Sequence, residues 1–257
     1  MNRIVYLFYI IGFSLLFYSC LDDRDKIAHD PFIGKQAARR SVGQSASQIL
    51  SDERFTRLEV EIVYMEGVRP TNEMINNIRG FLEELIRKPE GVIIQDRAIP
   101  GRGQSNYTVQ EIREMEEEHR GKYNDGNTIT LFVLVLDGHF NNDDEESFAL
   151  GAAYQNTSIV LFGKRIEENS GGFRRPSRGV LESTVALHEL GHLMGLVNVG
   201  SDMVVDHEDE EYDSHCDNSE CLMYWAVETS GLFNLTGNNI PALDQNCRND
   251  LTANGGR

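Results

Sequence analysis

Two histidines and a glutamate in the second half of the chain have the spacing of a metal site. His188 and His192 lie four residues apart in the sequence HELGH. Side chains four residues apart on a helix project from one face about one turn apart, so both imidazoles can reach a single Zn²⁺ ion. Glu189 would lie beside that ion without binding it, where a carboxylate can accept a proton from a water on the metal. The spacing therefore predicts a zinc-dependent hydrolytic site.

The residues around this motif place it on a buried helix with a defined end. Apolar side chains flank both histidines, and the helical pattern covers about residues 178–194. Buried histidines need a partner, and a metal ion is one. Gly195 can adopt the left-handed conformation that ends a helix and turns the chain back over the site. The pattern His-Glu-x-x-His-x-x-Gly resembles that of the metzincin clan of zinc endopeptidases.

The third metal ligand must come from farther along the chain. In metzincins it is usually a histidine three residues after the glycine, but Asn198 occupies that position here and is a poor zinc ligand. The sequence HCDNSECLM, which begins at His215, is similar to the archaemetzincin pattern His-Cys-x4-Cys-x-Met. That resemblance implies His215 as the third zinc ligand and Met223 as the residue of a tight turn under the metal. Residues 198–214 would then loop out, and His207 is the alternative third ligand.

Three further cysteines and an acidic loop suggest a second site. Archaemetzincins hold a structural zinc with four cysteines, and here Cys216, Cys221 and Cys247 occupy three of those positions while Asp250 stands at the fourth. A zinc site with three cysteines and one carboxylate is chemically feasible. Because disulfides form outside the cytoplasm, a disulfide from Cys216 to Cys221, or from one of them to Cys247, is the simpler expectation. The acidic loop 206–217 is a candidate Ca²⁺ site, although such runs are usually solvated.

The N-terminus has the features of an export signal. Residues 4–19 carry no charge, Arg3 precedes them and Cys20 ends the segment. The segment is short and N-terminal, which favours an export signal over a membrane-spanning helix. A signal that ends in cysteine resembles a bacterial lipoprotein signal, and the acidic residues 21–25 are similar to the surface-sorting signals of Bacteroidetes lipoproteins. The resemblance implies cleavage after residue 19, a lipid anchor on Cys20, and a location at the outer surface of the cell envelope.

The remaining chain predicts an α/β (α+β) fold. Residues 20–54 are polar and without a sustained period, which predicts a tether or pro-segment with a short helix near residues 45–54. Local sequence patterns then predict strands at 58–64, 91–94 and 127–136, one more strand or a hairpin at 150–162, and helices at 71–87, 108–120 and 178–194. We therefore expect a catalytic domain over residues 55–257. Its α/β half, 55–195, would hold a twisted mixed sheet and the active-site helix, and its C-terminal half, 196–257, would be irregular.

Charge and motif together define the expected function. The chain has 24 basic and 41 acidic residues, a net charge of −17, which argues against a nucleic-acid partner. We expect a monomeric zinc metalloendopeptidase with Glu189 as general base and peptides as substrates. The resemblance also implies that the strand within 150–162 binds an extended peptide in antiparallel orientation. The alternative is a surface protein that keeps the scaffold and binds ligands without cutting them, which Asn198 favours and the retained Glu189 opposes.

Overall fold

The computed structural model describes residues 30–143, 148–172, 175–228 and 239–257. The predicted export signal and Cys20 lie outside these residues. Within the described part of the chain, no helix combines the length and the apolar character needed to cross a membrane.

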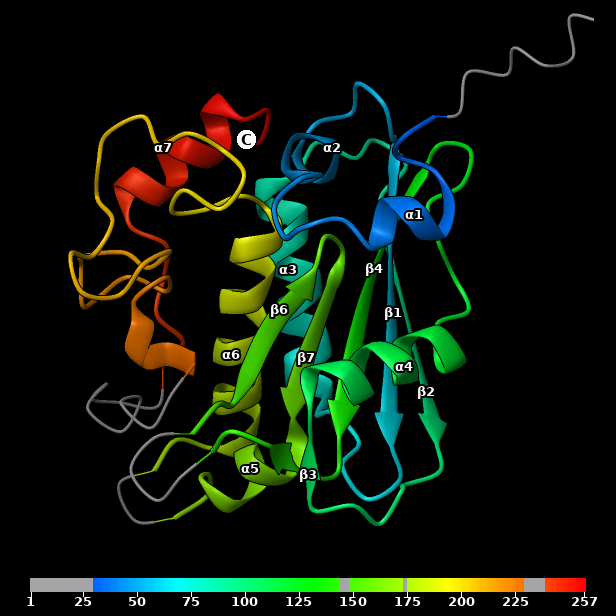
Figure 1. Cartoon of the computed structure of the whole chain (residues 1–257). Helices are drawn as coiled ribbons and strands as arrows, with labels where there is room; N and C mark the ends of the chain where they lie inside the picture. Colours follow the sequence, from blue (N-terminus) through cyan, green and yellow to red (C-terminus); the bar gives the residue numbers. More distant parts are fainter. Residues whose placement is uncertain (1–29, 144–147, 173–174, 229–238) are drawn as a thin grey trace, which may run out of the picture. The chain divides into compact units, whose positions relative to one another are not determined.

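A five-stranded sheet runs through the centre of the fold (Figure 1). Its strand order is β2 (Val92–Ile99), β1 (Arg57–Met65), β4 (Thr128–Leu136), β7 (Ser158–Phe162) and β6 (Gly151–Gln155). The first four strands are parallel, and β6 pairs antiparallel with β7 at the edge. All of β4 except its first residue is buried, which confirms the prediction of a central strand covered on both faces. Two short strands, β3 (Asn106–Tyr107) and β5 (His139–Phe140), form a separate pair.

Helices cover both faces of the sheet. On one face lie α3 (Asn72–Leu85) and α6 (Arg178–Leu193), which pack against each other, and on the other lies α4 (Val109–His119) (Figure 1). The hydroxyl of Thr71 accepts a hydrogen bond from the Met74 amide and so caps α3, which ends two residues before the predicted limit. These three helices, the strands and the mostly parallel sheet confirm the predicted α/β fold.

Residues 34–50, predicted as part of a tether or pro-segment, form two short helices that pack with the sheet, and the second lies where a short helix was predicted, near residues 45–54. Helices α1 (Gly34–Ala38) and α2 (Ala46–Leu50) belong to the same unit as the sheet, because the compact part of the chain begins at Pro31 and not at residue 55. Lys88 is 5% exposed, and its ammonium donates to the main-chain carbonyls of Gln48, Ser51 and Phe55. These hydrogen bonds from Lys88 hold the N-terminal segment against the rest of the fold. They leave no periodic pattern in the sequence, so the packing of this segment could not be predicted from it.

The C-terminal part is mostly irregular, as predicted. It contains a short 3-10 helix, η2 (Trp225–Glu228), and α7 (Gln245–Ala253), which the sequence analysis did not predict. The side chain of Asp244 caps α7 by accepting a hydrogen bond from the Cys247 amide, and Leu251 is buried. A polar helix of this kind depends on its cap and its tertiary contacts more than on an apolar period.

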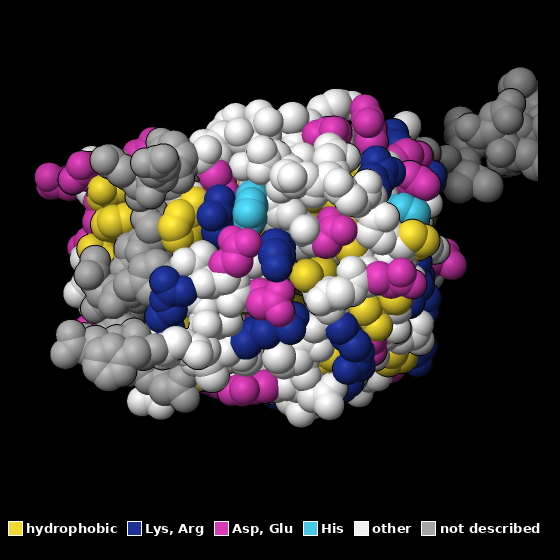
Figure 2. All heavy atoms as spheres, turned by 90° about the horizontal axis from the view of Figure 1, so that it is seen from below, with side chains coloured by type: hydrophobic (Ala, Val, Ile, Leu, Met, Phe, Trp, Pro, Cys, Tyr) yellow, Lys and Arg dark blue, Asp and Glu magenta, His cyan; other side chains and the backbone are white. Residues whose placement is uncertain are grey.

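A further short helix, α5 (Gly163–Glu168), follows β7 where no helix was predicted. Arg165 forms an ion pair with Asp143 at 2.8 Å, and Lys164 lies 3.7 Å from Glu167. Seen from below, the molecule presents interspersed basic and acidic side chains on this face (Figure 2). Such a mixture is typical of a solvated surface.

Candidate metal centre

Helix α6 places the HELGH motif in the interior of the protein. His188 and Glu189 are fully buried and His192 is 7% exposed. Helix α6 ends at Leu193, and Gly195, two residues later, has a φ of +86°. The Gly195 amide donates to the His192 carbonyl, and the Leu196 amide donates to the Gly191 carbonyl. This pair of bonds is a Schellman motif, which requires a left-handed residue at the Gly195 position. The predicted helix end is therefore confirmed.

The structure brings His188, His192 and His215 together. The Nε2 atoms of His188 and His192 are 3.1 Å apart, and the ring of His215 is centred 5.3 Å and 5.4 Å from the other two rings. One nitrogen of each ring lies within 4.8 Å of the others. Three nitrogens about 2.0–2.1 Å from a zinc ion in tetrahedral geometry are about 3.3 Å apart, so the donor set suits zinc after small side-chain movements.

Main-chain carbonyls orient two of these imidazoles. His188 Nδ1 lies 2.7 Å from the Leu222 carbonyl, and His215 Nδ1 lies 2.9 Å from the Asp213 carbonyl. A carbonyl oxygen only accepts hydrogen bonds, so each Nδ1 carries the proton and each Nε2 keeps its lone pair. This is the tautomer that binds a metal through Nε2. Sequence reasoning missed both contacts because backbone atoms make them.

Met223 lies directly beneath the motif. Its side chain is fully buried, and a Cβ atom added to Gly191 would stand 2.3 Å from the Met223 sulfur. Gly191 lies between the two histidines of α6, so its missing side chain is what lets Met223 approach the helix at this point. The carbonyl of the preceding residue, Leu222, is thereby held against His188.

We expect Gly191→Ala to destabilise the protein, because its methyl group overlaps Met223. Overpacking of a buried site costs about 1–3 kcal/mol of unfolding free energy. Gly80→Ala is the matched control, since it is also a helical glycine but has open space around its Cβ position. The control should gain about 0.5–1 kcal/mol from helix propensity. Chemical denaturation measures both, and equal shifts in the two variants would contradict the packing role of Met223.

Glu208 holds the loop that returns the chain to His215. One carboxylate oxygen accepts from the Ser214 amide at 2.6 Å, and the other accepts from the Asn198 side chain at 3.3 Å. Both Asn198 and Ser214 have positive φ, +62° and +66°, which are strained values for residues other than glycine. The Glu208 carboxylate therefore joins the two ends of the loop, one of which directly precedes His215.

Glu208→Ala should weaken zinc binding by about tenfold. Loss of a group that hydrogen-bonds to a metal ligand costs about 10–100-fold, and the lower end applies because Glu208 acts on His215 through Ser214. Glu210→Ala is the control, because Glu210 is an exposed acidic residue of the same loop. It removes the same charge without touching Ser214. Competition with a zinc chelator measures both affinities, and a control that loses as much affinity as Glu208→Ala would assign the effect to charge alone.

The alternative third ligand, His207, lies outside this trio. It is 2% exposed, and its Nε2 is 2.8 Å from a carboxylate oxygen of Asp250. The other oxygen of Asp250 accepts from the Val204 amide at 2.7 Å. His207 and Asp250 thus connect the loop to α7, and neither faces the HELGH motif.

The three cysteines converge with a carboxylate that sequence reasoning missed. Cys216, Cys221, Cys247 and Asp244 place one ligand atom each within 4.8 Å of one another. The expected disulfide is absent among these three cysteines: they are free, and Cys221 and Cys247 hold their sulfurs 3.6 Å apart, against about 2.05 Å for a disulfide. Asp250 is also wrong as the fourth donor, because it binds His207. The signal for Asp244 was its place three residues before Cys247, where it doubles as the helix cap.

Hydrogen bonding favours the metal-binding form of one sulfur. Hydrogen bonds from the thiols of Cys216 and Cys247 hold the pKa of the Cys221 thiol well below its usual range. The thiolate is the form of cysteine that binds metal. Three cysteine sulfurs and one carboxylate oxygen within 4.8 Å of one another are a donor set that suits a structural zinc.

The acidic loop does not gather its carboxylates around one point. Asp209 accepts hydrogen bonds from the amides of Glu211 and Tyr212, and Glu208 accepts from that of Ser214. In the described part of the chain, the only groups of potential ligands that converge are the three histidines and the cysteine cluster. The predicted Ca²⁺ site gains no support, since these side chains satisfy the backbone of the loop.

A cleft of about 220 Å³ opens at the histidines. It is lined by Val42, Ala152, Ala153, Glu189, His192, Val199, Ser214 and His215. Ala152 and Ala153 belong to β6, whose outer edge pairs with no other strand among the described residues. Val42 comes from the segment predicted to be a tether or pro-segment, and its place in the wall of the cleft was not predicted from the sequence.

Comparison with solved structures identifies the fold. Over 78% of this chain and 97% of the other, it superimposes on the crystal structure of archaemetzincin from Methanopyrus kandleri with a TM-score of 0.51 and 15% sequence identity. The fold is archaemetzincin-like. Metalloproteinase-II from Bacteroides fragilis is also similar, with a TM-score of 0.43 and 15% identity over 88% of this chain and 58% of that one. No protein-family model matches the sequence, and no curated protein matches it significantly.

Proposed function

We propose that this protein is a zinc-dependent endopeptidase. The observation that carries the proposal is the convergence of His188, His192 and His215 beside Glu189, at a cleft of an archaemetzincin-like fold. Glycine, methionine and loop contacts around the motif all serve to hold these side chains. A fold without this function has no need of a carboxylate at position 189.

The three histidines would hold zinc through their Nε2 atoms. When bound there, zinc supplies a Lewis acid that lowers the pKa of water and stabilises negative charge on a carbonyl oxygen. Glu189 would take a proton from the attacking water and later deliver it to the leaving amine. The carbonyls of Leu222 and Asp213 keep His188 and His215 in the required tautomer throughout.

The free edge of β6 would bind the substrate. An extended peptide can pair with an exposed strand through main-chain hydrogen bonds, and here an antiparallel peptide would pass the histidines at Ala152 and Ala153. The small side chains of these two residues leave room between the strand and Glu189. This geometry favours peptides over compact small-molecule substrates.

The cysteine cluster would bind a second, structural zinc. Its ligands would be Cys216, Cys221, Cys247 and Asp244, and the Cys221–Met223 segment would be fixed by it. Structural zinc sites contribute directly to folding, so removal of this ion should loosen the turn that carries Met223.

We further propose that the protein is a monomeric lipoprotein of the cell envelope, anchored through Cys20 and exposed at the outer surface. The uncharged segment before Cys20 and the acidic residues after it support this proposal. The described residues start beyond this segment.

Metal analysis and a peptide-library digest test the endopeptidase proposal together. The purified mature protein should contain zinc and cleave internal peptide bonds, and a hydroxamate should block the cleavage. Bound zinc without cleavage of any peptide would instead support the alternative function, a surface protein that binds ligands without cutting them, for which Asn198 at the usual ligand position is the specific observation.

A further inference from the structure

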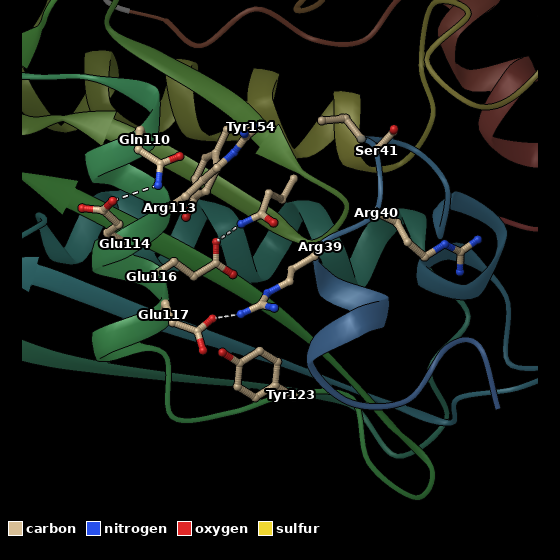
Figure 3. A pocket seen from close by; sticks show the side chains of 12 residues that line it. Arg39, Arg40, Ser41, Gln110, Arg113, Glu114, Glu116, Glu117, Tyr123 and Tyr154 are labelled. Carbon is tan, nitrogen blue, oxygen red and sulfur yellow. Dashed lines mark hydrogen bonds and ion pairs between the residues drawn. The ribbon is translucent and has the colours of Figure 1, made fainter. Parts of the chain in front are cut away.

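A second and larger cavity, about 670 Å³, adjoins the cleft (Figure 3). Its lining comes from four parts of the fold: the segment Arg39–Val42, helix α4, Tyr123 in the connection after α4, and the end of β6 at Tyr154 and Gln155. Val42 lines both the cavity and the cleft. Strand β6 continues from one to the other, since Ala152 and Ala153 face the cleft. The cleft lies on the α6 side of the sheet and the cavity on the α4 side, so a peptide paired with the edge of β6 would turn alternate side chains toward the cavity.

Two of the three glutamates in the cavity lining are already paired with cations. Glu116 is 4% exposed and forms an ion pair with Arg120, with 2.7 Å between Nη1 and Oε1. Glu117 contacts two cations, Lys35 at 2.9 Å and Arg39. The third glutamate of the lining, Glu114, accepts a hydrogen bond from a neutral glutamine.

Among the described residues, two arginines of the lining have no acidic partner. Arg40 donates to Gln44 at 3.0 Å and to the Pro31 carbonyl, both of which are neutral. No hydrogen bond or ion pair joins Arg113 to another described residue, and its side chain extends beside Tyr154 (Figure 3). The lining itself holds three arginines and three glutamates, and two of those glutamates are already paired with Lys35, Arg39 and Arg120. Within the part of the chain that the structure describes, the cations of the lining that keep no carboxylate partner are therefore Arg40 and Arg113, in a chain of net charge −17.

The direction of the substrate defines which of its residues meets the cavity. In an antiparallel peptide, the N-terminal part lies beside the C-terminal end of β6, which is Gln155. The cavity therefore receives residues that precede the scissile bond. With about 3.3 Å per residue and side chains that alternate between faces, the residue concerned lies about two to four positions before that bond.

We propose that this cavity is a subsite for the carboxylate of an aspartate or glutamate side chain in the substrate, with Arg113 as its main contact. The inference rests on the proposed endopeptidase function and adds the class of substrate that it favours, peptides with an acidic residue before the cleavage site. Arg113 can donate bidentate hydrogen bonds to a carboxylate, and Arg40 contributes charge. The subsite is open to solvent, so its contribution is moderate and falls as salt is added.

Matched peptides test the subsite. Each peptide carries Glu, Gln or Lys at one of the four positions before the scissile bond, and kcat/KM is measured at low salt. At one position, Glu should exceed Gln by about fivefold, mainly through a lower KM. Arg113→Gln should remove the preference and Arg113→Glu should reverse it in favour of Lys. Lys164→Gln, an exposed charge on α5 that is absent from the cavity lining, should leave the preference unchanged.

Binding to the Glu189→Gln variant separates the two proposals. Fluorescence anisotropy with the same peptides measures charge preference without hydrolysis. Tighter binding of the Glu peptide, lost in the double variant with Arg113→Glu, supports the subsite even if the wild-type protein cleaves nothing, an outcome that would overturn the endopeptidase proposal alone. Equal binding of the Glu and Lys peptides, or a preference that survives Arg113→Glu, overturns the subsite.

Discussion

Glu189→Gln should lower peptide hydrolysis by about 10²- to 10⁴-fold, the usual contribution of a general acid or base. Glutamine has the size and shape of glutamate but cannot accept a proton at neutral pH. Glu189 is fully buried in α6 and is not a member of the group of converging ligands, which consists of His188, His192 and His215. The substitution should therefore leave the zinc site intact. The expected result is a protein with normal zinc content and almost no activity.

The measurement combines kcat/KM with metal analysis of the same preparation. Thermal unfolding serves as the control, since an unchanged Tm shows that the variant retains its fold. Equal hydrolysis by the variant and the wild-type protein would remove Glu189 from the reaction. A variant that has lost its zinc would show that Glu189 helps to hold the metal.

His215→Ala should weaken zinc binding by more than about 100-fold, because loss of an outer-shell partner alone already costs about 10–100-fold. The two remaining histidines on α6 cannot supply the three protein ligands of a catalytic zinc site. His207→Ala is the informative comparison, because His207 is nearer to the motif in sequence than His215 yet binds Asp250 instead. It should keep the zinc but leave the buried carboxylate of Asp250 short of a partner, which costs about 1–3 kcal/mol of unfolding free energy.

The two variants therefore predict opposite pairs of results. His215→Ala changes zinc affinity in a chelator competition, and His207→Ala changes the midpoint of chemical denaturation with zinc affinity kept. The reverse ranking would transfer the third ligand to His207. It would also contradict the loop arrangement in which Glu208 fixes Ser214 next to His215.

The sequence alone was sufficient for the elements that repeat a pattern over a few residues. The active-site helix, its end at Gly195 and the central strand β4 were all predicted within two residues, because periodicity and helix-ending chemistry act locally. The spacing of His188 and His192 is of the same kind, since one helical turn fixes it. The resemblance of the HCDNSECLM segment to the archaemetzincin pattern also pointed to His215 and Met223. The structure places both residues beside the HELGH motif.

Only the tertiary structure decided which residues meet across long loops. From the sequence alone, either His215 or His207 could reach the two histidines of α6. His215 does so because Asp250 binds His207 and Glu208 holds Ser214, the residue before His215. Asp244, not Asp250, joins the cysteines, because the cap of α7 points its carboxylate toward them. The segment Arg39–Val42 likewise lines the cleft and the larger cavity. No periodic sequence pattern predicts these contacts. Closing a loop depends on the sum of many weak contacts made after the elements have formed, and no short stretch of sequence carries that information.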